Sequence, residues 1–176
     1  MTKKPIIIFP NPILRKVSQP VVKIDSKIKH LISEMLEVMY ASGGIGLAAV
    51  QIGVLYRLVV IDLWEDCPTN NPLVLINPEI LSISKDYSVT QEGCLSIPDY
   101  RANVKRPSFV TVKYLDCDAY PQIIYADGLL ATCLQHEIGH LNGVLFIDHI
   151  SRLKRDMVIE KFTKLAKLEK LAKFHN

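Results

Sequence analysis

The chain has 176 residues, a formal net charge of +3, and a hydrophobic fraction of 49%. These values are typical of one compact globular domain and exclude a disordered or low-complexity protein. Its apolar runs are too short to cross a bilayer, its first residues lack the long apolar stretch of a secretory signal, and its charge is too small to indicate nucleic acid. We therefore expect a cytoplasmic protein with no membrane or DNA partner and with reduced cysteines.

The N-terminal part of the chain predicts irregular structure followed by a helix. Residues 1–24 contain four prolines and should form extended segments and turns. Asp25 or Ser26 can cap the helix that follows, and apolar residues recur at helical spacing between Ile28 and Met39. Ser42-Gly43-Gly44 should end it.

The middle of the chain, about residues 45–125, predicts short strands rich in branched aliphatic residues and separated by turn residues. The predicted strands are Tyr56–Leu63, Leu73–Ile76, Ile80–Ser84, Phe109–Leu115 and Gln122–Tyr125. No long helical pattern alternates with these strands, which disfavours a parallel sheet built from β-α-β units.

Two more helices are predicted after the strands. One begins at Asp127 and ends near Asn142-Gly143, and the other covers about 152–173. One face of the last helix carries Val158, Phe162, Leu165, Leu168 and Ala172, and lysines lie on the other face.

From residue 151 onward there are eight Lys and Arg but only three Asp and Glu, so this end of the chain is basic. The predicted fold class is α+β, with mixed or antiparallel strands around a central metal-binding helix and a C-terminal helix. We predict that residues 1–150 form the catalytic part, and that residues 151–176 form a basic amphipathic helix of the same domain.

A metal-binding motif lies in the second of these helices. His136 and His140 are four residues apart on one helix face, so both imidazoles can reach one ion. Glu137 follows His136 and is expected beside the open position of the metal, where it can take a proton from metal-bound water and deliver it to a leaving group.

Catalytic metal sites of this kind use three protein ligands, so one more is needed. Downstream, the Asp, His and Glu side chains lie in no recognisable protease context. Cys133 is one turn before His136, but it lies about 10 Å along the helix from His140 and is more consistent with a buried thiol. Cys67 and Cys117 lie in polar stretches that indicate nothing. Cys94 remains, after a glycine at the end of a strand.

Three blocks of sequence together resemble the signature motifs of the peptide deformylase family. In chain order they are Gly44–Gln51, Glu92–Ser96 and Gln135–His140. The resemblance implies a hydrolase that removes the formyl group from the N-terminal formylmethionine of newly made polypeptides and releases formate. It implies Cys94, His136 and His140 as ligands of Fe²⁺, for which Zn²⁺ or Ni²⁺ can substitute.

The resemblance also implies roles around the metal. The Gln51 side chain and the Leu95 backbone N–H are expected to stabilise the developing oxyanion. The remaining residues are expected to bind N-formylmethionyl peptides, with the glycines pairing with an extended chain, an apolar pocket accepting methionine, and two charged residues at its rim. They are Gly44, Ile45, Gly46, Gly93, Leu129, Cys133, the ring of His136, Glu92 and Arg101.

One position departs from the family pattern, because Gly139 stands where aspartate is usual. A glycine inside a helix costs about 1 kcal/mol relative to alanine. The missing carboxylate also predicts an orphaned partner, for which Arg106 is the candidate, and weaker activity or metal retention.

Other functions remain open from the sequence. They are a zinc endopeptidase, a binding module with a closed structural metal site, and a deformylase-like protein whose activity is changed by Gly139. The lack of a downstream ligand disfavours the endopeptidase, and the lack of a fourth ligand disfavours the closed site. Resemblance to bacterial deformylases further suggests that the basic C-terminal helix contacts the ribosome; a solvated lysine face is the alternative.

Overall fold

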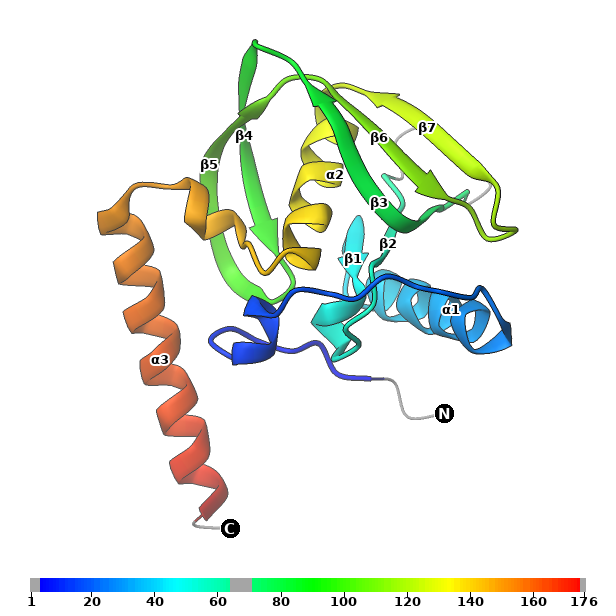
Figure 1. Cartoon of the computed structure of the whole chain (residues 1–176). Coiled ribbons are helices and arrows are strands. Elements are labelled where there is room, and N and C mark those ends of the chain that lie inside the picture. The colour runs from blue at the N-terminus through cyan, green and yellow to red at the C-terminus, as the bar shows by residue number, and fades with distance from the viewer. Residues whose placement is uncertain (1–3, 64–70, 175–176) are drawn as a thin grey trace.

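The computed structural model describes residues 4–63 and 71–174, so Cys67 lies outside the described residues. It contains three α-helices, three short 3₁₀ segments and seven strands (Figure 1). The helices are α1 (Ser26–Ala41), α2 (Gly128–Leu141) and α3 (Arg152–Phe174), and the 3₁₀ segments are η1 (Pro12–Arg15), η2 (Ala49–Ile52) and η3 (Phe146–His149). The strands are β1 (Gly46–Ala48), β2 (Leu58–Ile61), β3 (Leu73–Ile83), β4 (Tyr87–Cys94), β5 (Ile97–Pro107), β6 (Val110–Leu115) and β7 (Pro121–Ala126).

The strands form two antiparallel sheets on either side of a central helix. One sheet has the order β1-β2-β3-β6-β7, and the other is the β4–β5 pair. Figure 1 shows α2 between β4–β5 and the larger sheet, and α2 packs on β1, β2 and β5. Ten of its fourteen residues are buried, as expected of a helix enclosed by protein. The predicted α+β class is confirmed.

The first helix forms where the sequence predicts it. The Asp25 carboxylate accepts hydrogen bonds from the backbone N–H groups of Lys27 and Ile28, at 3.0 and 3.2 Å. Such a cap stabilises a helix by about 1 kcal/mol. The apolar face between Ile28 and Met39 is buried against β1 and β2. Helix α1 therefore supports the strand that enters the site.

The two strands predicted over residues 73–84 are one strand, β3, interrupted by a bulge. Asn77 adopts a left-handed conformation with φ of 53°, and it precedes Pro78. Its side chain accepts from the Val21 backbone N–H at 2.8 Å and donates to the Val21 carbonyl at 2.9 Å. These two bonds replace the pairing that the bulge removes, so the strand continues beyond residues that usually end one.

The sequence predicted a strand that ends at Cys94, but not the long β4–β5 hairpin to which this strand belongs. Its outward face carries the apolar Tyr87 and Val89, both more than half exposed, whereas its inward face carries buried Glu92 and Arg106. The inward face also carries the buried apolar residues Ala102 and Val104, so each face of the hairpin mixes polar and apolar side chains. Because the alternation is mixed, hydrophobic periodicity did not reveal the hairpin.

Helix α3 begins as predicted, but its apolar face is only half covered. Val158 and Phe162 are buried, and the ring of Phe162 packs edge-on against Phe9 with centroids 6.1 Å apart. Leu165 and Leu168 are 44% and 62% exposed, so the rest of the described chain covers only the first part of this apolar face, as far as Phe162. Figure 1 shows the helix extending away from the rest of the chain. Among the described residues, no helix is long and apolar enough to cross a membrane.

Candidate active site

The fold brings together three potential metal ligands from distant parts of the sequence. Cys94 is the last residue of β4, and His136 and His140 lie on α2. One ligand atom of each lies within 4.8 Å of the others, and Cys94 Sγ is 3.2 Å from His140 Nε2. A thiolate with two imidazoles suits a divalent transition metal such as iron or zinc. Three donors also leave a coordination position for water or substrate.

His136 is anchored by a buried charge network. Its Nδ1 lies 2.9 Å from Glu92 Oε2, and Arg106 binds the same carboxylate through Nε and a terminal nitrogen at 2.5 and 2.9 Å. Burial acts to raise the pKa of Glu92, but the bonds from Arg106 and His136 outweigh it and lower the pKa to about 2. The carboxylate is therefore charged and fixes the ring, which leaves Nε2 for a metal.

Two expectations from the sequence change as a result. Glu92 is 5% exposed and engaged by Arg106 and His136, so it anchors a histidine from beneath the cavity instead of standing at a rim. Arg106 is paired with Glu92, so the prediction that it is orphaned by Gly139 is wrong. A Cβ at position 139 would instead lie 3.3 Å from the Val144 carbonyl oxygen.

His140 is held in a different way. It is 1% exposed, and its Nδ1 is buried with no hydrogen-bond partner among the described residues. Burial lowers the pKa of this imidazole well below its usual value. A neutral ring is the form that binds metals, so His140 also fits the ligand set.

Glu137 follows His136 on α2, and its carboxylate is buried against Gly46. It is 4% exposed, and burial raises its pKa to about 7. A carboxyl group with a pKa near neutrality can both accept and return a proton. Its Oε1 would be 2.6 Å from a Cβ at Gly46, and Cys133 Sγ would be 2.9 Å from it. Position 46 is therefore glycine because the β1 backbone packs directly on the carboxylate and the thiol.

Two hydrogen-bond donors lie near Cys94. Gln51 accepts from the Ala48 backbone N–H at 2.8 Å, which turns its amide nitrogen toward Ser96 Oγ at 3.2 Å and Cys94 Sγ at 3.6 Å. Leu95 occupies the two-residue turn between β4 and β5, and its backbone N–H has no acceptor among the described residues. The structure thus places both expected donors next to the end of β4.

A cavity of about 970 Å³ opens over these groups. Burial raises the pKa of the Cys133 thiol well above its usual value, which disfavours this residue as a ligand. All the expected substrate-contacting residues line the cavity: Gly44, Ile45, Gly46, Glu92, Gly93, Arg101, Leu129, Cys133 and His136. The sequence did not indicate Thr90, Gln91, Asp99, Tyr100 or Thr132, which also line it, because the hairpin that carries four of them was not recognised.

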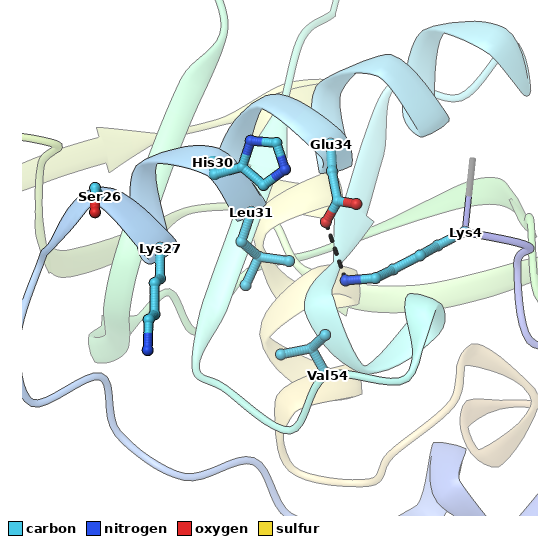
Figure 2. A pocket seen from close by; sticks show the side chains of 7 residues that line it. All are labelled: Lys4, Ser26, Lys27, His30, Leu31, Glu34 and Val54. Carbon is cyan, nitrogen blue, oxygen red and sulfur yellow. Dashed lines mark hydrogen bonds and ion pairs between the residues drawn. The ribbon is translucent and has the colours of Figure 1, made fainter. Parts of the chain in front are cut away.

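A second hollow, of about 430 Å³, shares no lining residue with this cavity. Figure 2 shows it between α1 and the beginning of the chain, where Lys4 and Glu34 form an ion pair of 3.0 Å and Leu31 and Val54 also line the hollow. None of the candidate metal ligands lines this second hollow, whereas Cys94 and His136 line the first cavity.

Comparison with known proteins agrees with this geometry. The family model described as polypeptide deformylase matches residues 3–156. The chain belongs to the polypeptide deformylase family. A peptide deformylase of Agrobacterium fabrum is 59% identical over 95% of this chain and 98% of its own length. This deformylase family comprises enzymes, so the chain is an enzyme and not a binding module.

Solved structures of deformylases share the fold. A peptide deformylase from Ehrlichia chaffeensis, in complex with actinonin, aligns with a TM-score of 0.87 at 42% identity and covers 93% of this chain and 98% of that chain. One from Synechococcus elongatus, also with actinonin, aligns with a TM-score of 0.86 at 43% identity, covering 93% of this chain and 90% of that chain. The deformylase function is thereby supported over the endopeptidase.

Proposed function

We propose that Cys94, His136 and His140 hold the metal of this deformylase and that Glu137 is its general acid/base. The observation that supports this most directly is the clustering of the three donor atoms within 4.8 Å, next to a buried carboxyl group whose pKa is raised to about 7. The metal is proposed to be Fe²⁺, with Zn²⁺ or Ni²⁺ as substitutes, since the resemblance implies iron and the donor set suits all three ions.

The protein groups can be assigned to successive tasks in formyl hydrolysis. When bound, the metal supplies a Lewis acid for the formyl carbonyl and lowers the pKa of water. Gln51 Nε2 and the Leu95 N–H donate to the carbonyl oxygen as it gains negative charge. Glu137 accepts the proton of the attacking water and delivers it to the amine nitrogen of methionine, so that formate and a free N-terminus are produced.

The substrate is proposed to lie as an extended strand between β1 and β4. Gly44 and Gly46 line the cavity beside β1, and Gly93 lines it on β4, whose second edge is unpaired among the described strands and so suits pairing with a peptide main chain. The methionine side chain would enter the apolar part formed by Ile45, Leu129, Cys133 and the ring of His136. Glu92 is assigned to orienting His136 beneath this pocket.

The setting of the reaction follows from its substrate. Formylated N-termini belong to chains leaving the ribosome, so we place the enzyme in the cytoplasm and propose that α3 contacts the ribosome. The exposed lysines of α3 and its uncovered Leu165 and Leu168 support a contact. We also assign the segment from residue 151 to the same domain as residues 1–150, because Val158 and Phe162 pack with Phe9 and Phe146.

The decisive experiment measures formate release from a formyl-Met tripeptide, with cleavage of the same peptide's internal bonds followed in parallel. The protein is supplied with Fe²⁺ or Ni²⁺ under reducing conditions. We expect formate without internal cleavage, and competition by actinonin, the molecule bound in two of the matched structures. Internal cleavage without formate would favour the endopeptidase, and neither reaction would favour an altered function linked to Gly139.

A further inference from the structure

Strand β7 forms an exposed edge of the larger sheet. Within residues 4–63 and 71–174 it pairs only with β6, so the backbone groups along its other side have no strand partner. Figure 1 shows β7 at the outer border of the sheet, on the opposite side of the molecule from α3. The other edge of the same sheet, β1, has only three residues, and all of them are buried. The edge of β7 is therefore the longer and more accessible of the two.

This edge lacks most of the features that protect edge strands from pairing with other chains. Proteins usually protect such strands with charged side chains, bulges or short length. Residues Pro121–Ala126 carry no charge, and all six pair with β6 in one uninterrupted register. The only protective residue in the strand is Pro121, at its first position. The rest of β7 can therefore accept a strand from another chain.

The outward face of β7 is apolar and carries no net charge. Ile123 and Tyr125 are 56% and 80% exposed, and they share a face because side chains alternate along a strand. Across from Ile123, on the two strands behind it, Lys113 and Glu79 form an ion pair of 2.8 Å. The face thus offers apolar side chains and no excess charge, which disfavours a nucleic acid or a strongly charged protein as its partner.

A second copy of the same strand fits this edge. In an antiparallel pair, residues directly opposite each other point to the same face of the sheet. A two-fold axis at Ile124 meets this condition, because it places Ile123 of each copy opposite Tyr125 of the other. Residues 122–126 would then be paired, and Pro121, which has no N–H to donate, would lie at the end of the ladder. Within the paired strands no like charges would face each other.

We propose that the chain forms a two-fold symmetric dimer in which β7 of one copy pairs antiparallel with β7 of the other, joining the two larger sheets into one continuous sheet. The interface is small, since each copy contributes one strand and one row of exposed side chains. A reversible dimer in the micromolar range is therefore expected. No residue of β7 lines either cavity, so this inference is independent of the proposed function.

Sedimentation velocity and light scattering of the full chain, between about 1 and 500 μM, test the proposal. We expect the mass to rise from that of a monomer to that of a dimer. Ile123→Lys and Tyr125→Lys should each weaken the dimer by about tenfold, because lysine on an edge strand opposes pairing. Both lysines together should abolish it. Ile123→Lys combined with Tyr125→Glu places opposite charges across the interface twice and should restore most of the association, which checks the register.

The matched control is Val89→Lys, the same kind of change at a 62% exposed residue on β4 in the other sheet, and it should leave the dimer intact. Thermal melting followed by circular dichroism shows whether each variant is folded. Hydrogen exchange of the wild-type β7 amides needs no variant and should become slower at the higher concentration. A chain that stays monomeric at the highest concentration, a dimer that tolerates both lysines, a dimer lost only in Val89→Lys, or exchange of β7 that does not change with concentration would each overturn the inference.

Discussion

The two histidines of α2 are fixed by opposite means. His136 is hydrogen-bonded to Glu92, which is bonded to Arg106, so two charged side chains hold the ring in place. The Nδ1 of His140 is buried with no partner in the described structure, and the ring is held by packing and by the contact of its Nε2 with Cys94 Sγ at 3.2 Å. The comparison shows that one metal ligand depends on electrostatics and the other on packing. Their sensitivities to mutation should differ accordingly.

The largest effect is expected from removing the acid/base that lies between these two histidines. Glu137→Gln keeps the size of the side chain but cannot take up a proton. We expect turnover to fall at least about a hundredfold, since general acid/base catalysis contributes that much or more. Metal content and the unfolding midpoint should stay near the wild-type values. Hydrolysis of formyl-Met peptides at a rate close to wild type would exclude Glu137 as the acid/base.

Removing one ligand at a time tests whether Cys94, His136 and His140 bind the same metal ion. Alanine at Cys94, His136 or His140 should each abolish stoichiometric metal, measured by elemental analysis of the purified protein. Cys133→Ala is the matched control, because this thiol is buried close to Glu137 but should keep its proton. A Cys94→Ala protein that retains full metal would show that the thiolate is not a ligand.

The anchor of His136 can be broken without touching a ligand. Glu92→Gln leaves the Arg106 charge buried and unpaired, so we expect the free energy of unfolding to fall by about 3 kcal/mol. Metal loss to a chelator should become about tenfold faster, because the ring of His136 is less well oriented.

The double variant Glu92→Gln with Arg106→Gln removes both charges and should recover much of the stability. Denaturant unfolding measures this recovery, and chelation kinetics measure the orientation of the ring. If the single variant matches wild type in both assays, the network does not anchor His136.

The anchoring of His136 by Glu92 and Arg106 was the part of the site that was hardest to predict from the sequence. The spacing of His136 and His140 is local to one helix, and helix periodicity alone places both on one face. Cys94 followed from elimination and family resemblance. The link from Glu92 to Arg106 depends on the register of β4 and β5, in which Glu92 faces Ala102 and Arg106 faces Ser88, so the arginine must reach along the sheet. No local sequence pattern predicts this pairing between Arg106 and Glu92.

Similar reasons account for the errors in the fold. Periodicity correctly predicted α1, α2 and the extent of α3, because this signal is local. The Asp25 cap of α1 is confirmed, whereas Asp127 stands at the start of α2 without a side-chain capping hydrogen bond. The Asn77 bulge depends on bonds to Val21, which is 56 residues away. The exposure of Leu165 depends on how far the rest of the chain packs along α3, and the periodicity of α3 gives no information about that packing.

The smallest expected effect on stability and metal retention is at Gly139, which precedes His140, the histidine held mainly by packing. The sequence suggested that aspartate here would improve the protein by engaging Arg106, but Arg106 already binds Glu92. A side chain at this position instead approaches the Val144 carbonyl oxygen, 3.3 Å from the Cβ. Gly139→Ala should gain about 0.5 kcal/mol, because the helix-propensity gain of roughly 1 kcal/mol is partly offset by this crowding. Gly139→Asp should be about 1 kcal/mol less stable than Gly139→Ala, since its carboxylate faces a carbonyl with no donor provided. Gly139→Asn, of the same shape but uncharged, should fall between them and so separates charge from size. Denaturant unfolding of the three variants, together with chelation kinetics, measures both stability and the hold on His140. If Gly139→Asp were the most stable of the three and retained metal longest, a hydrogen-bond donor near Val144 would have to move to bind the new carboxylate. His140 would then be stabilised by an electrostatic interaction as well as by packing.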